Sequence, residues 1–213
     1  MGYYFPEGSS QQFSQTFASA KTITALTNAN PAVATSVAHG YTTGDEILLT
    51  SGWEDATDTV WKITVLTADT FSISGLDASN TSFYPAGTGT GTAQKISGWT
   101  SIPQVLTIST SGGDARFTDV NPLAKRNGVK IPTGFNATAV TLTLAHDASQ
   151  AAYITMQGIS RNLSKVAFKQ VISGGSVTYG FGYMSVSEMP KLNVNQVNTV
   201  DAAITVLGRS ISY

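Results

Sequence analysis

The strongest constraint on the fold is a strict alternation of apolar and polar residues in several short segments. In residues 139–145, AVTLTLA, three large apolar residues alternate with two threonines. Successive side chains of a strand point to opposite faces, so this pattern predicts a strand that is buried on one face. Residues 164–172 continue the pattern. In residues 176–184 it predicts that the aromatic residues face the core and that glycine, serine and threonine form a small polar face.

Composition supports this interpretation. Only 12% of the 213 residues are charged, and threonine, serine and glycine are abundant, which favours strands and tight turns over helices. The absence of cysteine excludes disulfides, thiol nucleophiles and cysteine-bound metals. The first residues lack a basic region followed by an apolar run, and no apolar run approaches 18 residues. We therefore expect a mainly β protein that is soluble and carries no secretion signal.

Residues 22–96 have the pattern of a separate unit. Turn signals recur there at intervals of about ten residues, as expected for a small antiparallel barrel or sandwich. Residues 22–95 carry seven acidic and two basic residues, whereas the rest of the chain carries six acidic and ten basic ones. This asymmetry predicts an inserted β module over residues 22–96 and a discontinuous domain made of residues 1–21 and 97–213.

Two further elements are predicted outside this unit. Residues 146–161 have an apolar stripe and predict a short amphipathic helix, with Asp147 as its cap and Gln150 completing a capping box. Residues 111–135 are long for a connection and contain Asn127 and Gly128, a strong hairpin-turn signal. We expect the latter segment to project as a hairpin or loop with a basic tip.

His39 is the residue that most suggests catalysis. Asp45 follows it by six residues, and Ser36 and Ser51 lie nearby in the sequence. A catalytic triad needs these groups to converge, and the chain has no Gly-x-Ser-x-Gly elbow. We therefore expect His39 to pack or hydrogen-bond locally at a turn, with Asp45 and Glu46 adding surface charge. No enzymatic activity is expected.

Three other segments could bind ligands. Residues 53–58 carry three carboxylates, but they lack the alternating pattern of a calcium loop, so we expect a solvated acidic loop. The glycine run 86–91 has neither the lysine nor the following helix of a phosphate loop, which favours a strand connection. Sites that bind single-stranded nucleic acid combine basic with aromatic side chains. The basic residues Lys125, Arg126 and Lys130 have no aromatic residues among them, so the signal for such a site is weak. No metal and no cofactor is expected.

Part of residues 22–96 resembles a small β module that recurs in tailed-phage virion proteins and has been likened to part of the catalytic-cysteine domain of the ubiquitin-activating enzyme. The shared pattern is a His-Gly-aromatic turn, a Gly-Asp pair, an alternating strand and a later Thr-Phe pair. Since the chain has no cysteine, no ubiquitin chemistry is implied. The residues that match the pattern are His39, Gly40, Tyr41, Gly44, Asp45, Thr70 and Phe71.

The remainder resembles the major tail tube protein of long-tailed, non-contractile phages (siphophages). The resemblance rests on GYYFPEGSSQQFSQTFASAKT, SIPQVLTISTSGGDARF, LTLAHDASQAAYITMQGISR and the last 32 residues. It implies a tail-tube-type antiparallel β-sandwich or barrel with one flanking helix. It also implies stacked hexameric rings that form a conduit for DNA ejection, and a place in the virion tail after assembly in the host cytoplasm.

The implied partners are further copies of the chain, the tape-measure protein inside the tube, and the tail terminator and distal tail proteins at its ends. Double-stranded DNA would pass through without specific binding, and no membrane is involved. Cations facing the DNA would hinder its passage, so we expect the basic residues at contacts between subunits or rings and the acidic module on the exterior. The expected contact residues are Tyr3, Tyr4, Phe5, Arg116, Phe117, Lys125, Arg126, Asn127, Gly128, Lys130, Ile131 and Phe135.

One alternative function remains open on the sequence. The chain could be a tail decoration or a host-surface adhesin whose inserted module binds carbohydrate or a cell-surface protein. A third possibility, an enzyme acting on cell-wall polymer, would need a convergent acid pair or triad that the sequence does not provide.

Overall fold

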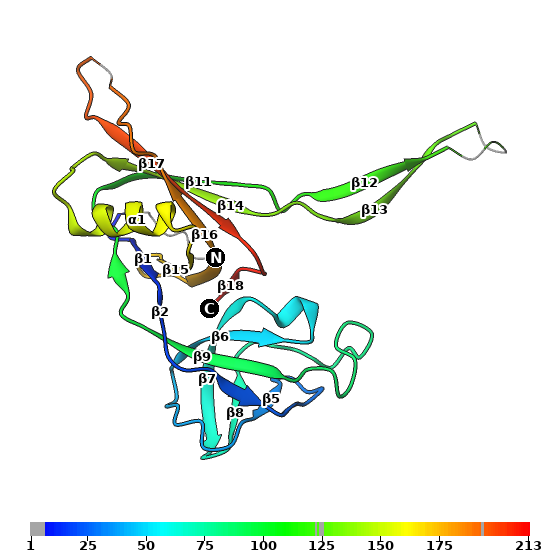
Figure 1. The fold of residues 1–213 in the computed structure, drawn as a ribbon. Helices are drawn as coiled ribbons and strands as arrows, with labels where there is room; N and C mark the ends of the chain where they lie inside the picture. Colours follow the sequence, from blue (N-terminus) through cyan, green and yellow to red (C-terminus); the bar gives the residue numbers. More distant parts are fainter. Residues whose placement is uncertain (1–6, 122, 124–125, 193) are drawn as a thin grey trace.

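The structure is a computed structural model that describes residues 7–121, 123, 126–192 and 194–213. It contains two eight-stranded antiparallel sheets, a projecting two-stranded arm and one α-helix (Figure 1). The predicted mainly β fold is therefore confirmed. No helix in the described residues is long and apolar enough to cross a membrane.

The first sheet, here called the large sheet, is formed by strands from both ends of the chain. Its order is β10-β1-β15-β16-β17-β14-β11, and β18 pairs with β16. It curls around an apolar core, so its two edges, β1 with β10 on one side and β11 on the other, approach each other (Figure 1). Its strands are β1 (Ser10–Ser14), β10 (Thr100–Ser101), β11 (Val105–Ser111), β14 (Ala139–Ala145), β15 (Lys165–Val171), β16 (Val177–Val186), β17 (Thr199–Val206) and β18 (Ile211–Ser212).

Helix α1 (Ala151–Arg161) packs on the inner face of this sheet and buries its apolar stripe there. Ala152, Met156 and Ile159 are buried, as the sequence predicts. The predicted cap is wrong: the helix begins after Gln150, and no side chain caps it. Asp147 instead accepts hydrogen bonds from the backbone N–H and hydroxyl of Ser149, which forms a turn before the helix.

The second sheet forms a small barrel within residues 16–97. Its order is β2-β9-β6-β7-β8-β5-β4, and β3 also pairs with β9. β3 pairs with β9 near one edge of the sheet, and β4 pairs with β5 at the other edge. Because only Thr24 separates β3 from β4, residues 21–26 join the two edges and close the sheet into a barrel. Its elements are β2 (Thr16–Phe17), β3 (Lys21–Ile23), β4 (Ala25–Leu26), β5 (Val33–Thr35), β6 (Glu46–Ser51), the short 3-10 helix η1 (Glu54–Ala56), β7 (Thr59–Thr67), β8 (Thr70–Ile73) and β9 (Gly91–Ser97).

The small barrel packs directly on the large sheet. Leu48, Val60 and Ile96 of the barrel form one buried cluster with Tyr179 and Phe181 of β16. This packing corrects the prediction of a small polar face on residues 176–184, because the opposite face of β16 is also buried, over the core next to α1. Along this part of the strand neither face is free.

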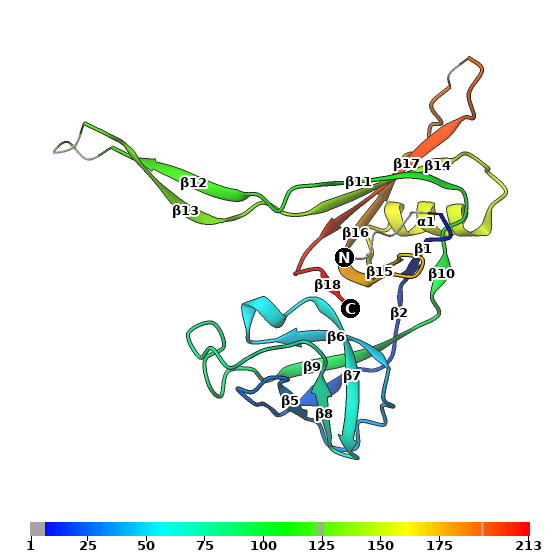
Figure 2. The ribbon, with the colours of Figure 1, turned by 180° about the vertical axis from the view of Figure 1, so that it is seen from behind.

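The arm consists of β12 (Ala115–Val120) and β13 (Val129–Phe135), and extends from the ends of β11 and β14 (Figure 2). The predicted projecting hairpin is therefore confirmed for its described residues. Nearly all arm residues are exposed. A lone two-stranded ribbon is marginally stable in water, so packing against another surface would stabilise this arm.

Candidate assembly interface

The arm presents apolar side chains on both of its faces. Phe117 lies opposite Pro132, and Phe135 falls on the same face because its partner Ala115 is two residues before Phe117. This aromatic face is open to solvent, with Phe117 57% and Phe135 74% exposed. Such exposure is typical of a surface that is buried against a partner.

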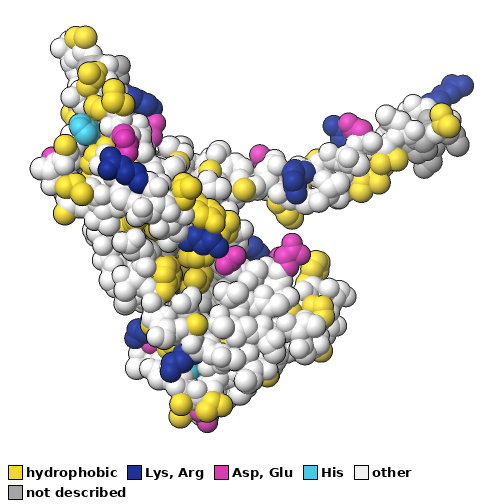
Figure 3. Space-filling model, viewed as in Figure 1, with side chains coloured by type: hydrophobic (Ala, Val, Ile, Leu, Met, Phe, Trp, Pro, Cys, Tyr) yellow, Lys and Arg dark blue, Asp and Glu magenta, His cyan; other side chains and the backbone are white. Residues whose placement is uncertain are grey.

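The other face of the arm carries aliphatic residues. Val120 pairs with Val129, and Thr118 pairs with Ile131. Each pair is two residues from the other along its strand, so all four side chains lie on the same face. Ile131 is 47% exposed. With apolar groups on both sides, the ribbon is suited to lie between two surfaces rather than flat on one. The space-filling view shows apolar side chains along the arm and a basic group at its tip (Figure 3).

The basic residues predicted as contacts are spread along the arm. Arg116 lies over Gly134, since a Cβ added at that glycine would meet its guanidinium at 3.1 Å. Lys130 is 3.9 Å from the carboxylate of Asp119, and both side chains are exposed, so this pair adds little stability. The predicted contacts Arg126, Asn127 and Gly128 lie at the exposed tip. Tyr3, Tyr4, Phe5 and Lys125 lie outside the described residues.

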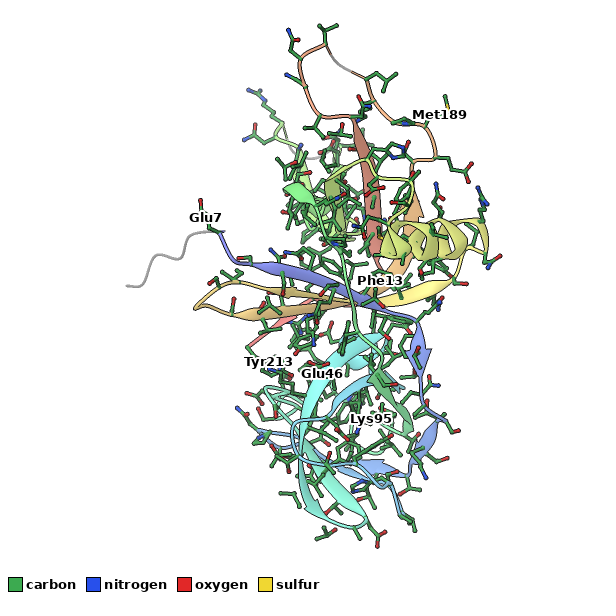
Figure 4. The ribbon with its side chains drawn as sticks, turned by 90° about the vertical axis from the view of Figure 1, so that its left-hand side faces the viewer. Glu7, Phe13, Glu46, Lys95, Met189 and Tyr213 are labelled. Atoms are coloured by element: carbon green, nitrogen blue, oxygen red, sulfur yellow. The ribbon has the colours of Figure 1, made fainter. Side chains whose placement is uncertain are left out.

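A second projection was not predicted from the sequence. The loop between β16 and β17, residues 187–198, extends from the large sheet at the end opposite the arm (Figures 1 and 4). A backbone bridge between Lys191 and Thr199 and an ion pair between Lys191 and Asp201 hold its base. The sequence signal that could have revealed this loop was a set of four large apolar residues without strand or helix periodicity. They are all strongly exposed: Met189, Leu192, Val194 and Val197.

The outer face of β11, β14 and β17 is small and polar. Thr107, Ser109 and Ser111 of β11 lie beside Thr141 and Thr143 of β14. On β17 the same face continues through Asp201, Ala203 and Thr205, next to Tyr183 and Ser185 of β16. The charged groups on or beside this hydroxyl face are Asp201, paired with Lys191, and Lys165, which lies near the Tyr183 ring.

The hydroxyl face and the small barrel lie on opposite sides of the molecule. In Figures 1 and 2, β11, β14 and β17 form the upper layer, α1 and β1 lie beneath them, and the small barrel lies at the bottom. The chain thus places the hydroxyl face on the side of the molecule away from its acidic barrel.

A buried charge network connects the barrel to the large sheet. Glu46 accepts a hydrogen bond from the Tyr179 hydroxyl (2.5 Å) and pairs with Lys169 (3.2 Å), while Lys169 also lies over the Trp99 ring. Burial and the Glu46 carboxylate raise the pKa of Tyr179, so the phenol stays protonated and donates. Tyr213 joins the same junction, with its hydroxyl donating to the Ser74 carbonyl (Figure 4).

This network corrects the prediction that Asp45 and Glu46 add surface charge. The side chain of Glu46 is 16% exposed and that of Asp45 only 11%. Asp45 pairs with Lys95 at 2.7 Å and accepts from the backbone N–H and hydroxyl of Thr42. Burial acts to raise the pKa of Asp45, but these hydrogen bonds and the lysine outweigh it and hold the pKa below its ordinary value.

His39 forms part of the barrel core, as predicted. Its Nδ1 accepts a hydrogen bond from the Tyr41 N–H (2.9 Å), so Nε2 carries the proton and donates to the Thr67 carbonyl (3.2 Å). The ring stacks on Tyr41 and meets Phe71 edge-on. Both nitrogens are occupied by backbone groups, so His39 serves as a structural connection rather than a base.

The glycine run 86–91 also has a structural explanation. A Cβ at Gly89 would meet the Trp53 ring at 2.7 Å, and one at Gly91 would meet the Thr50 carbonyl oxygen at 1.9 Å. These glycines therefore permit close packing in a strand connection. Among the described residues no group of three or more His, Cys, Asp or Glu could hold a metal ion.

Comparison with known proteins fits a chain built to assemble. No curated protein matches it. The model of the phage tail tube protein family matches residues 51–213, from the end of β6 in the small barrel through the arm and the whole C-terminal half of the large sheet. The match covers more than half of the chain and includes both projections and the hydroxyl face. The chain therefore belongs to the phage tail tube protein family, whose members are structural components of the virion tail.

Proposed function

We propose that this chain forms stacked hexameric rings that make up the tail tube of a siphophage and conduct DNA into the host. The hydroxyl face of β11, β14, β17 and the end of β16 lines the bore, and the small barrel faces outward. The observation that carries the proposal is the position of these two surfaces on opposite sides of the molecule (Figure 1).

The dimensions are compatible with DNA passage. Six copies of a four-stranded sheet give about 24 strands, about 4.8 Å apart and tilted about 40°, for a circumference of ~150 Å. After side chains, a bore of roughly 35–40 Å remains, whereas a DNA duplex is about 20 Å across.

The chemistry of the hydroxyl face favours sliding over binding. Each lysine or arginine that neutralises a phosphate adds affinity that depends on salt. The face consists mainly of serine, threonine and alanine. Of the two lysines beside it, Lys191 is paired with Asp201 and Lys165 lies over the Phe181 and Tyr183 rings. Double-stranded DNA therefore passes without specific binding, and the tape-measure protein occupies the same space during assembly.

The arm and the loop at residues 187–198 make the contacts between copies. Their exposed apolar groups are covered in the tube, and the basic residues of the arm lie at ring contacts instead of in the bore. The tail terminator and distal tail proteins close the ends of the tube. Subunits are made and assembled in the host cytoplasm before they join the virion.

Electron microscopy of the purified protein tests the proposal. We expect rings or tubes of uniform bore, with density for the small barrel on the outside. Discrete monomers or trimers that bind host cells would instead support a tail decoration or adhesin and would contradict the tube.

A further inference from the structure

The large sheet is open on one side, and the opening forms a groove. β11 is the strand at one edge, and at the other edge the short β10 covers only Gln12 and Phe13 of β1; β1 and β11 do not pair with each other. Instead they line a groove of about 790 Å³, together with residues 102–104, which follow β10, and Ile172, which follows β15. An edge strand that faces such a space leaves backbone donors and acceptors available to another strand.

The groove is uncharged and partly apolar. Leu106, at a bulge in β11, is 53% exposed, and Ile102, Ile108 and Ile172 add aliphatic surface. Three glutamines supply amide groups, and one of them is poorly satisfied. Gln11 on β1 is 3% exposed, and its Oε1 has no hydrogen-bond partner within the described part of the chain. A buried carbonyl of this kind is costly unless a donor reaches it.

The arm has the complementary chemistry. Its aromatic face, formed by Phe117, Pro132 and Phe135, supplies apolar surface, and each strand has an outer edge with free backbone N–H groups. Neither surface carries a charge that the other would have to neutralise, apart from the Asp119–Lys130 pair, which is internal to the arm.

The arm of a given chain cannot fill its own groove. The groove lies along Val105–Ile108, the first half of β11, whereas the arm leaves from the last residue of β11 and extends away from it (Figures 1 and 2). A donor at one end of a strand and an acceptor at the other form a heterologous contact, which propagates from copy to copy in one direction.

We propose that the groove between β1 and β11 receives the aromatic face of the β12–β13 arm from a second copy of this chain. The inference rests on the proposed tube and names the acceptor for the contact that the arm makes. Leu106 contacts Phe117 of the incoming arm, and an arm donor reaches Gln11. The aliphatic face of the arm remains available to another neighbour.

Designed disulfides test this docking directly, because the chain has no cysteine of its own. Leu106→Cys and Phe117→Cys proteins are prepared separately, mixed in small amounts with unsubstituted protein, assembled and oxidised. We expect a covalent dimer between one chain of each kind, since a disulfide requires Cα atoms about 4.4–6.8 Å apart. Thr118→Cys is the matched control, because its side chain lies on the other face of the arm and should give little dimer with Leu106→Cys.

The outcomes separate this inference from the proposed function. Tubes that form without a 106–117 bond, or with equal yields for residues 117 and 118, would overturn the groove assignment and leave the tube intact. A bond within one chain between Leu106→Cys and Phe5→Cys would also overturn it, because the N-terminal residues would then fill the groove. Absence of tubes from the unsubstituted protein would contradict the proposed function itself.

Discussion

Replacement of Ile131 by aspartate tests the role of the arm in assembly. Ile131 is 47% exposed on the aliphatic face of the arm. Full burial of an isoleucine stabilises by roughly 1.5–3 kcal/mol, so covering the exposed half contributes about 1 kcal/mol per contact. An aspartate in the same contact adds an unpaired group whose desolvation costs about 2 kcal/mol or more. The total of ~3 kcal/mol corresponds to about a 100-fold weaker contact.

Sedimentation measures this effect as the critical concentration for tube formation. We expect Ile131→Asp to raise it about 100-fold, with the thermal unfolding of the monomer unchanged because the side chain makes no core contact. Leu66→Asp is the matched control: Leu66 is 55% exposed but lies on the small barrel, away from the arm. An unchanged critical concentration for Ile131→Asp, or an equal rise for Leu66→Asp, would refute the reasoning.

Three further predictions concern the junction, the barrel and the bore. Glu46→Ala should lower the free energy of unfolding by about 2–3 kcal/mol, since it leaves the largely buried Lys169 and the Tyr179 hydroxyl unpaired. Glu54→Ala, in the 3-10 helix η1 where Glu54 is exposed, should leave the melting temperature unchanged; equal effects of the two substitutions would argue against the network. Asp45→Asn should destabilise the protein at pH 7, because the pKa of Asp45 is lowered in the folded state. The stability from its pairing with Lys95 is then present above about pH 4 and is lost as the pH falls toward the depressed pKa. The free energies of unfolding of variant and parent, measured by urea titration, should therefore converge in acid; a difference that stays constant with pH would count against the Asp45–Lys95 pairing. Thr143→Lys should make assembled tubes retain double-stranded DNA in a salt-dependent manner, and retention no greater than in the parent would show that residue 143 is outside the bore.

Local sequence patterns predicted the elements of the fold well. The alternation in residues 139–145 correctly assigned the buried face of β14, because each side chain there faces either the core or the outside. Residues 111–135 were predicted to project because they combine a turn signal with a length that no compact connection needs, and β12 and β13 within this range do project, whereas Ser111 belongs to β11. The start of α1 was misplaced because Asp147 forms a turn with Ser149, a local alternative to capping the helix.

The junction could not be predicted because it depends on distant parts of the chain. Glu46 and Lys169 are 123 residues apart, and neither neighbourhood signals the other. The same holds for β16: its pattern predicts a face buried in the core of its own sheet, but Tyr179 and Phe181 on that face are buried against the small barrel. The groove likewise arises from two strand edges, β1 and β11, that meet only when the large sheet curls.

A reconstruction of the assembled tube would test the central claim most directly. We expect the hydroxyl face, including Ser109, Thr141 and Thr143, to line a bore wide enough for duplex DNA, with the small barrel on the outer surface. A tube in which the small barrel or the basic residues of the arm line the bore would contradict the account.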